Sequence, residues 1–260
     1  MGSLRFRTIA SRSIRNTQAA MDRLLRFSDY DVFAYLSSGL ATFVVVDLAF
    51  STGIIIGADW DAAQGTITVL MAYPVGHMVA EPAAYFLERK FVRQVLRPPS
   101  KILLEDVPLA RRSRWRRIIF ANYHSPAPCN VVASVMRGVR QSDTDATIGE
   151  AIFWIAHTVA QRDEIAYPRM QSFLNLYGFC RNLAFVAFCG GLLIGGLMIY
   201  ASLLSSGSFN PERGLLAAGI LLAGAVLFLR YLKFHRLYTL EVLVAFAAFQ
   251  EKRETRAGDN

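Results

Sequence analysis

Three ionisable residues, Asp47, His77 and Glu81, lie inside long apolar stretches. Charged groups at such positions are unfavourable in lipid, so they mark a functional site by default. Asp47 is near the centre of the apolar run 36–58, and His77 is the midpoint of the run 67–87. If the two runs are antiparallel membrane helices, both residues reach the same depth. Glu81 follows on the same helix face, about 6 Å further along at 1.5 Å per residue.

This Asp/His/Glu ladder is compatible with three kinds of chemistry. A proton or ion relay needs titratable groups in a row within the membrane. A polar clasp would only fix the register of the two helices, at about 0.6 kcal/mol per interhelical hydrogen bond. A metal site would use Asp47, His77 and Glu81 as three protein ligands. Because no second histidine lies nearby in the sequence, we do not expect a metal ion there. We expect no other cofactor either.

The elements that must position these residues are apolar helices. Hydrophobic residues make up 53% of the 260 residues and charged residues 18%, which favours a membrane protein. About 20 apolar residues cross a hydrocarbon core of about 30 Å, and four runs approach this length: 36–58, 67–87, 183–204 and 214–232. We therefore predict an all-α, polytopic membrane protein with four transmembrane helices and a cytoplasmic helical domain.

Polar segments between these runs divide the chain. The short link 59–65 makes the first two runs a hairpin, and Pro98 and Pro99 end its helical extension. We predict five parts: a basic cytoplasmic N-terminal arm (1–30), a transmembrane hairpin with a cytoplasmic helix extension (31–97), a cytoplasmic helical domain (98–178), a second transmembrane hairpin (179–236), and a cytoplasmic C-terminal helix and tail (237–260).

Three shorter predictions concern the polar parts. Periodic isoleucines predict an amphipathic helix over 143–167, ended or interrupted by Tyr167-Pro168. The apolar segment 237–250 is too short to span a membrane, which predicts a buried or interfacial helix. The polar tail 251–260 is predicted to be disordered.

Small residues recur every four positions on one face of the third run, at Ala187, Gly191 and Gly195. Small residues at this spacing let two helix backbones approach closely. We predict that this face packs against another helix, in the same chain or in a neighbouring copy.

Five arginines surround a tryptophan in the polar domain: Arg111, Arg112, Arg114, Trp115, Arg116 and Arg117. We expect this cluster to lie on the anionic head groups of the lipid bilayer, where each basic residue contributes about 1 kcal/mol. The alternative is packing against Glu105 and Asp106. The net charge of +8 also suggests nucleic acid, but no accompanying fold signature is present, so we do not expect nucleic acid as a partner.

The distribution of Lys and Arg predicts the orientation. They concentrate in the N-terminal arm, in 88–182 and in the C-terminal region, whereas the two short links are mostly acidic. The positive-inside rule then places the chain in the cytoplasmic (inner) membrane with both termini in the cytoplasm. Residues 1–28 hold six arginines and no apolar core, unlike a cleaved secretory signal; a mitochondrial transit peptide shares this composition.

No sequence motif identifies an enzymatic reaction. His124, Cys129 and His157 match no zinc spacing, and no nucleophile elbow is present. We therefore predict a membrane-anchored interaction, sensor or assembly subunit without catalysis of its own, with a second copy or another protein as partner. The alternative is an oligomeric proton or ion channel or transporter that uses Asp47, His77 and Glu81, and the third hypothesis is a membrane-embedded metalloenzyme.

Overall fold

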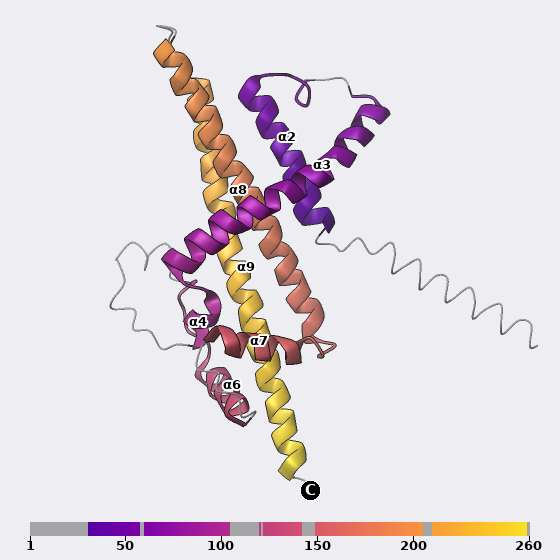
Figure 1. Cartoon of the computed structure of the whole chain (residues 1–260), viewed down its shortest axis with the longest axis vertical. Coiled ribbons are helices and arrows are strands. Elements are labelled where there is room, and N and C mark those ends of the chain that lie inside the picture. The colour runs from indigo at the N-terminus through magenta and orange to yellow at the C-terminus, as the bar shows by residue number, and fades with distance from the viewer. Residues whose placement is uncertain are drawn as a thin grey trace, which may run out of the picture.

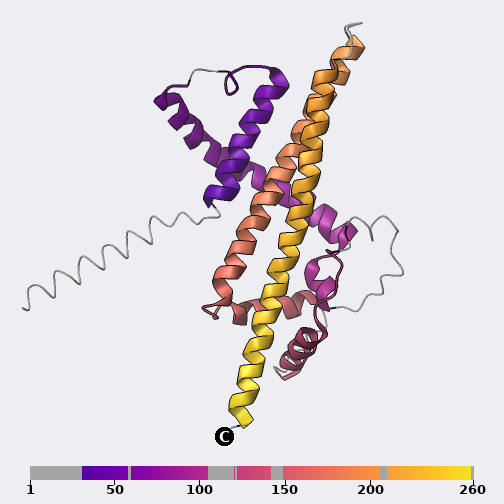
Figure 2. The same ribbon diagram turned by 180° about the vertical axis from the view of Figure 1, so that it is seen from behind.

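The computed structural model describes residues 31–57, 60–104, 120, 122–141, 149–204 and 210–258, and all regular secondary structure in these ranges is helical. Two long antiparallel helices, α8 (Ala166–Leu204) and α9 (Pro211–Gly258), form the axis of the molecule (Figure 1). The helices α2 (Ser37–Phe50) and α3 (Ala62–Ala83) lie beside one half of this axis. Short helices gather around the other half (Figure 2).

In the part of the chain that the structure describes, α8 and α9 are the two helices long and apolar enough to cross a membrane. Only 28% of the most apolar window of each is buried within the molecule. Large apolar side chains are exposed on both helices, among them Leu192, Ile199 and Leu203 of α8 and Leu215, Leu222 and Val226 of α9. A buried core helix of a water-soluble protein would hide most of these side chains, so the exposure favours contact with lipid.

The last helix differs from the prediction. The sequence predicts a fourth run that ends near Leu232, a separate helix over 237–250 and a disordered tail, but α9 continues unbroken from Pro211 to Gly258. The basic segment 230–236 contains neither glycine nor proline, and Lys and Arg are good helix formers, so nothing there ends the helix. Similarly, α8 begins at Ala166, well before the third apolar run. We call the half of the molecule that contains α2, α3 and the apolar parts of α8 and α9 the apolar half, and the half that contains the short helices the polar half. Both long helices therefore extend from the apolar half into the polar half.

The start of α8 also corrects a prediction. The helix α7 (Gly149–Ala160) ends before Tyr167, and the carboxylate of Asp163 then accepts hydrogen bonds from the backbone N–H groups of Ile165 (2.9 Å) and Ala166 (3.0 Å). Asp163 thereby satisfies N–H groups that the first turn of a helix leaves free. Pro168 lies in this first turn, where its missing N–H is not needed. It therefore belongs to a helix start, not to a helix end.

The helix α3 begins at a capping box, in which the Asp61 carboxylate accepts from the Gln64 N–H at 2.7 Å and the Gln64 side chain accepts from the Asp61 N–H at 3.4 Å. It continues directly into a π-helix, η2 (Ala84–Leu96). The helix ends at Leu96, and Arg97 adopts a left-handed φ of 69° before the two prolines. The predicted end of this helical extension is confirmed.

The contact between α2 and α3 depends on two glycines. A Cβ atom on Gly39 would lie 1.8 Å from the carbonyl oxygen of Ala72, and one on Gly76 would lie 1.8 Å from that of Tyr35. Tyr35 belongs to the π-helix η1 (Asp31–Leu36) that precedes α2. The close contact thus lies at the start of the first apolar run, and the two helices diverge toward their link (Figure 1). The predicted hairpin with aligned midpoints is wrong in this respect.

The polar half has a core built on α9. The short helices α4 (Pro99–Leu104), α6 (Cys129–Gln141) and α7 pack on its C-terminal part. Val242 and Phe246 of α9 are fully buried together with Val135 of α6 and Ala156 of α7. The polar segment therefore takes a large part of its core from a helix that also enters the apolar half.

Candidate functional site

Asp47 closes the loop that follows α2. Its buried carboxylate accepts a hydrogen bond from the Thr52 hydroxyl and three from the backbone N–H groups of Ile54 (3.1 Å), Ile55 (3.1 Å) and Ile56 (2.8 Å). Consecutive N–H groups that converge on a carboxylate form a small anion-binding concavity. These four partners of the Asp47 carboxylate all belong to the loop that follows α2.

His77 contacts the other end of the first apolar run. Its ring stacks on Tyr35, with centroids 3.7 Å apart and planes 19° apart, and meets the Tyr73 ring edge-on at 4.7 Å. Tyr35 precedes Asp47 by twelve residues, which is about 18 Å along a helix. The structure therefore does not bring His77 and Asp47 together. The reason is the glycine contact, which sets Gly76 against Tyr35 and so fixes the neighbouring His77 at this level.

Glu81 and His77 are both exposed on α3. Nowhere in the described ranges do three His, Cys, Asp or Glu side chains gather closely enough to hold a metal ion. The predicted Asp/His/Glu ladder is therefore replaced by a buried loop anchor, Asp47, and two residues on the surface of α3.

The small-residue face of α8 lies against α9. A Cβ atom on Gly191 would lie 2.6 Å from the Leu221 side chain and 3.1 Å from the Ala217 carbonyl oxygen. Gly195 has more room, because its Cβ would lie 3.8 Å from Ala217. Ala187 occupies the same face, 3.2 Å from where a Cβ atom on Gly224 of α9 would be.

The neighbouring glycine points to a different helix. A Cβ atom on Gly190 would lie 2.5 Å from the Val45 side chain of α2. Adjacent glycines therefore let α8 approach α2 on one side and α9 on the other. The predicted basic cluster, Arg111, Arg112, Arg114, Trp115, Arg116 and Arg117, lies outside the described residues.

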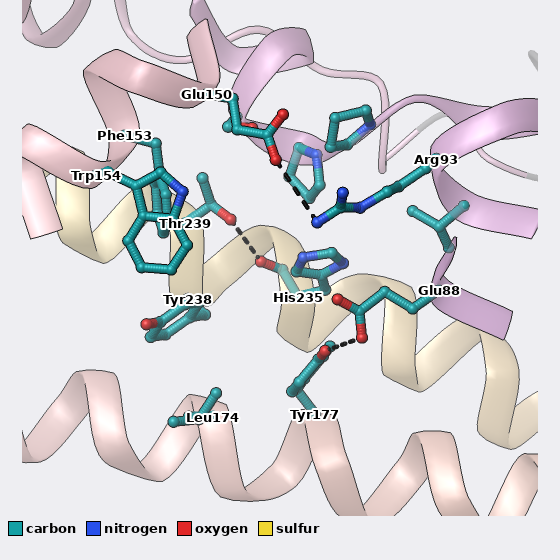
Figure 3. Close-up of a pocket in the computed structure, with 14 residues that line it drawn as sticks. Glu88, Arg93, Glu150, Phe153, Trp154, Leu174, Tyr177, His235, Tyr238 and Thr239 are labelled. Atoms are coloured by element: carbon teal, nitrogen blue, oxygen red, sulfur yellow. Dashed lines mark hydrogen bonds and ion pairs between the residues drawn. The ribbon is translucent and has the colours of Figure 1, made fainter. Parts of the chain in front are cut away.

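A group of polar side chains that the sequence analysis did not assemble joins the two halves of the molecule. We call it the polar junction: Glu88 of η2 with Tyr177, Arg181 and Asn182 of α8. The Arg181 guanidinium donates to Glu88 Oε2 at 3.0 Å. The Tyr177 hydroxyl donates to the same oxygen, and this second hydrogen bond is drawn in Figure 3. Only 9% of the Arg181 side chain and 24% of the Glu88 side chain are exposed.

The polar junction also reaches the start of the first apolar run. Arg181 Nε donates to Asn182 Oδ1 at 3.3 Å, and the fully buried Asn182 amide donates to the Ala34 carbonyl oxygen at 3.5 Å. Three segments far apart in sequence thus meet at one place. The sequence signal was a pair of opposite charges at matching positions, Glu88 just after one apolar run and Arg181 just before another.

The surroundings of Glu88 favour its charged form. Burial raises the pKa of this carboxyl, but the hydrogen bond from Tyr177 and the charge and hydrogen bond of Arg181 have the larger, opposite effect, so the net shift is downward. His235 adds a positive charge only in acid, because burial lowers its own pKa to about 4. Glu88 therefore stays ionised at neutral pH although it is mostly buried.

A cavity of about 230 Å³ lies beside the polar junction, between η2, α7, α8 and α9 (Figure 3). On one side Arg93 pairs with Glu150 at 3.6 Å. The His235 ring stands close to Tyr177, with centroids 5.0 Å apart, and its Nδ1 atom is shielded from solvent without a hydrogen-bond partner among the described residues. The remaining walls are largely apolar and include the aromatic side chains of Phe153, Trp154 and Tyr238.

This arrangement can hold a small polar molecule, because a carboxylate and an imidazole face a cavity with apolar walls. No protein-family model, curated protein sequence or solved structure matches the chain.

Proposed function

We propose that the chain is a multi-pass protein of the cytoplasmic membrane and serves as a membrane-anchored interaction, sensor or assembly subunit without catalysis of its own. The observation that carries this proposal is the continuity of α8 and α9. Both helices extend unbroken from the half of the molecule where their apolar side chains are exposed into the core of the polar half. A partner bound to the polar half would then act directly on helices that enter the membrane.

The proposal includes α2 and α3 as two further spans. Large apolar side chains are exposed on α3, among them Ile67, Leu70, Met71 and Met78. The C-terminal end of α2 and the N-terminal end of α9 lie at the same end of the molecule (Figure 1), where the Arg213 guanidinium donates to the Ser51 hydroxyl at 2.7 Å. This supports a topology with both links on the outer side and both termini in the cytoplasm.

The polar junction supports the sensor or assembly role. Glu88 is held by α8 on one side and borders the cavity on the other, so a molecule in the cavity would contact the same carboxylate that fixes η2 to α8. A ligand changes a conformational equilibrium only through contacts that differ between the two conformations. A contact with the Glu88 carboxylate could provide this difference.

The surface of α3 supports the proposed second copy or protein partner. His77 and Glu81 are exposed there beside Met78. An exposed carboxylate is unfavourable in lipid unless another protein surface covers it. We propose that one contact with a second copy or another protein covers both His77 and Glu81.

Cysteine labelling in intact cells tests this proposal. The three native cysteines are first replaced, and single cysteines are then placed at Asp61, Ser206, Ser142 and in the C-terminal tail. We expect the first two positions to react with a membrane-impermeant reagent and the last two to react only after lysis. Labelling of Ser142 from outside, or release of the protein from membranes by alkaline carbonate, would refute the proposed topology.

A further inference from the structure

A second cavity, of about 620 Å³, lies between α9 and the segment around Tyr123. Three cationic residues of α9 line it at successive three-residue spacings: Arg230, Lys233 and Arg236. None of the described residues that line it is acidic. Residues three apart are neighbours on a helix surface, so the three positive charges lie close to one another.

These charges are not compensated within the described residues. None of the three forms an ion pair there, since the ion pairs of α9 use Glu241 and Glu254. Arg236 donates one hydrogen bond to the Ser125 carbonyl oxygen at 3.1 Å, but its Nε atom is shielded from solvent and has no partner in that part of the chain. Neighbouring like charges repel one another, and a shielded, unpaired guanidinium N–H is unfavourable. An anion in the cavity would relieve both effects.

The apolar side of the same cavity indicates what kind of anion. Val226 and Leu229 border it just before Arg230, and both side chains are exposed on the apolar half of α9. A ligand that fills the cavity would therefore contact apolar surface at one end and guanidinium and ammonium groups at the other. Basic pockets of this kind at the cytoplasmic side of membrane helices suit lipid head groups.

We propose that this cavity binds the phosphate head group of an anionic phospholipid, with an acyl chain along Val226 and Leu229. Arg230 and Lys233 are the main phosphate contacts, and the unpaired Arg236 N–H supplies a third. The inference rests on the proposed function, since a lipid reaches the cavity only if this part of α9 lies in a membrane. Inorganic phosphate has the same anionic chemistry without the acyl chain, and the experiment separates the two.

Lipid titration of the purified full-length protein tests the proposal. Thermal stabilisation in neutral detergent is measured against added phosphatidylglycerol, phosphatidylcholine or inorganic phosphate. We expect phosphatidylglycerol to bind about 25-fold more weakly to the Arg230→Gln/Lys233→Gln variant, because each basic residue contributes about 1 kcal/mol and about 1.4 kcal/mol equals a tenfold change. The matched control Lys252→Gln/Arg253→Gln removes two exposed charges from the same helix and should bind like the parent.

Three results would overturn the lipid site. They are equal stabilisation by phosphatidylcholine, an unchanged affinity of the double variant, and stabilisation by inorganic phosphate as strong as by phosphatidylglycerol at the same concentration. If the double variant does not fold, Lys233→Gln alone should still lose about fivefold. Carbonate extraction of the parent separates the two proposals: release from membranes refutes the proposed function, whereas retention without a phosphatidylglycerol preference refutes only the lipid site.

Discussion

Arg181 of α8 and Glu88 of η2 form an ion pair at 3.0 Å, although the two residues are 93 positions apart in the chain. The Tyr177 hydroxyl donates to the same carboxylate oxygen, so Glu88 Oε2 accepts two hydrogen bonds from one face of α8. Tyr177 and Arg181 are one helical turn apart, which places both donors on the side of α8 that faces η2. This ion pair fixes the helix that leaves the first hairpin against the helix that enters the second.

The first prediction concerns this ion pair. Glu88→Ala removes the carboxylate that compensates the buried charge of Arg181, and the loss of one member of a buried pair costs about 3 kcal/mol or more. The control is Glu150→Ala, because the side chains of the Glu150–Arg93 pair are 41% and 55% exposed, and solvent-exposed pairs contribute less than about 1 kcal/mol. Thermal unfolding in detergent should separate the two variants clearly. Equal melting temperatures would show that the polar junction does not stabilise the fold.

The second prediction is the pH dependence of the stabilisation that the ionised Glu88 side chain provides. The pKa of Glu88 is lowered in the folded protein, because the Tyr177 hydrogen bond and the nearby positive charges outweigh the opposing effect of burial. The stabilisation is therefore complete above the unfolded pKa of about 4.3 and is lost as the pH falls through the lower folded value.

Melting curves of the parent and Glu88→Gln between pH 7 and pH 3 measure this dependence. We expect a constant difference near neutrality that shrinks as the medium becomes acidic. A difference that grows on acidification would mean that the folded pKa is raised, contrary to the contacts of Glu88.

The third prediction ranks glycine positions by the space around them. Gly76→Ala should destabilise the fold most, because its Cβ atom would overlap the Tyr35 carbonyl oxygen and the backbone of one of the two helices would have to move. Such overpacking costs about 1–3 kcal/mol or more. Gly191→Ala should follow, since the Leu221 side chain can shift partly. Gly196→Ala is the control, with no atom within 4 Å of the new Cβ. Melting temperatures in detergent should follow this order, and a uniform response would contradict the close helix contacts.

The elements with strong local signals were predictable. Pro98 and Pro99 mark the end of η2, and the spacing of Ala187, Gly191 and Gly195 matches the side of α8 that meets α9. The unbroken course of α9 was not predictable from hydropathy, since the change from apolar to basic near Arg230 resembles the end of a span, although its backbone has no reason to stop.

The polar residues were harder to place. Matching Asp47 with His77 assumed that hairpin helices align at their midpoints, but backbone contacts at Gly39 and Gly76 set the crossing at the other end of α2. The Glu88–Arg181 pair depends on how the two hairpins pack on each other, which no periodicity within either segment encodes.

The last prediction separates the observed role of Asp47 from the relay hypothesis. In a double-mutant cycle, changes in residues that share an interaction are coupled, whereas changes at distant sites add. Asp47→Asn and Thr52→Val should be coupled, because the Thr52 hydroxyl donates to the Asp47 carboxylate. Asp47→Asn and His77→Ala should add, because His77 stacks on Tyr35, three turns away along the helix. Melting temperatures of the five variants, with proteolysis of the 52–56 loop as a second readout, measure both couplings. Strong coupling of Asp47 to His77, together with loss of proton flux in reconstituted vesicles when either is changed, would restore the relay and overturn the loop-anchor role.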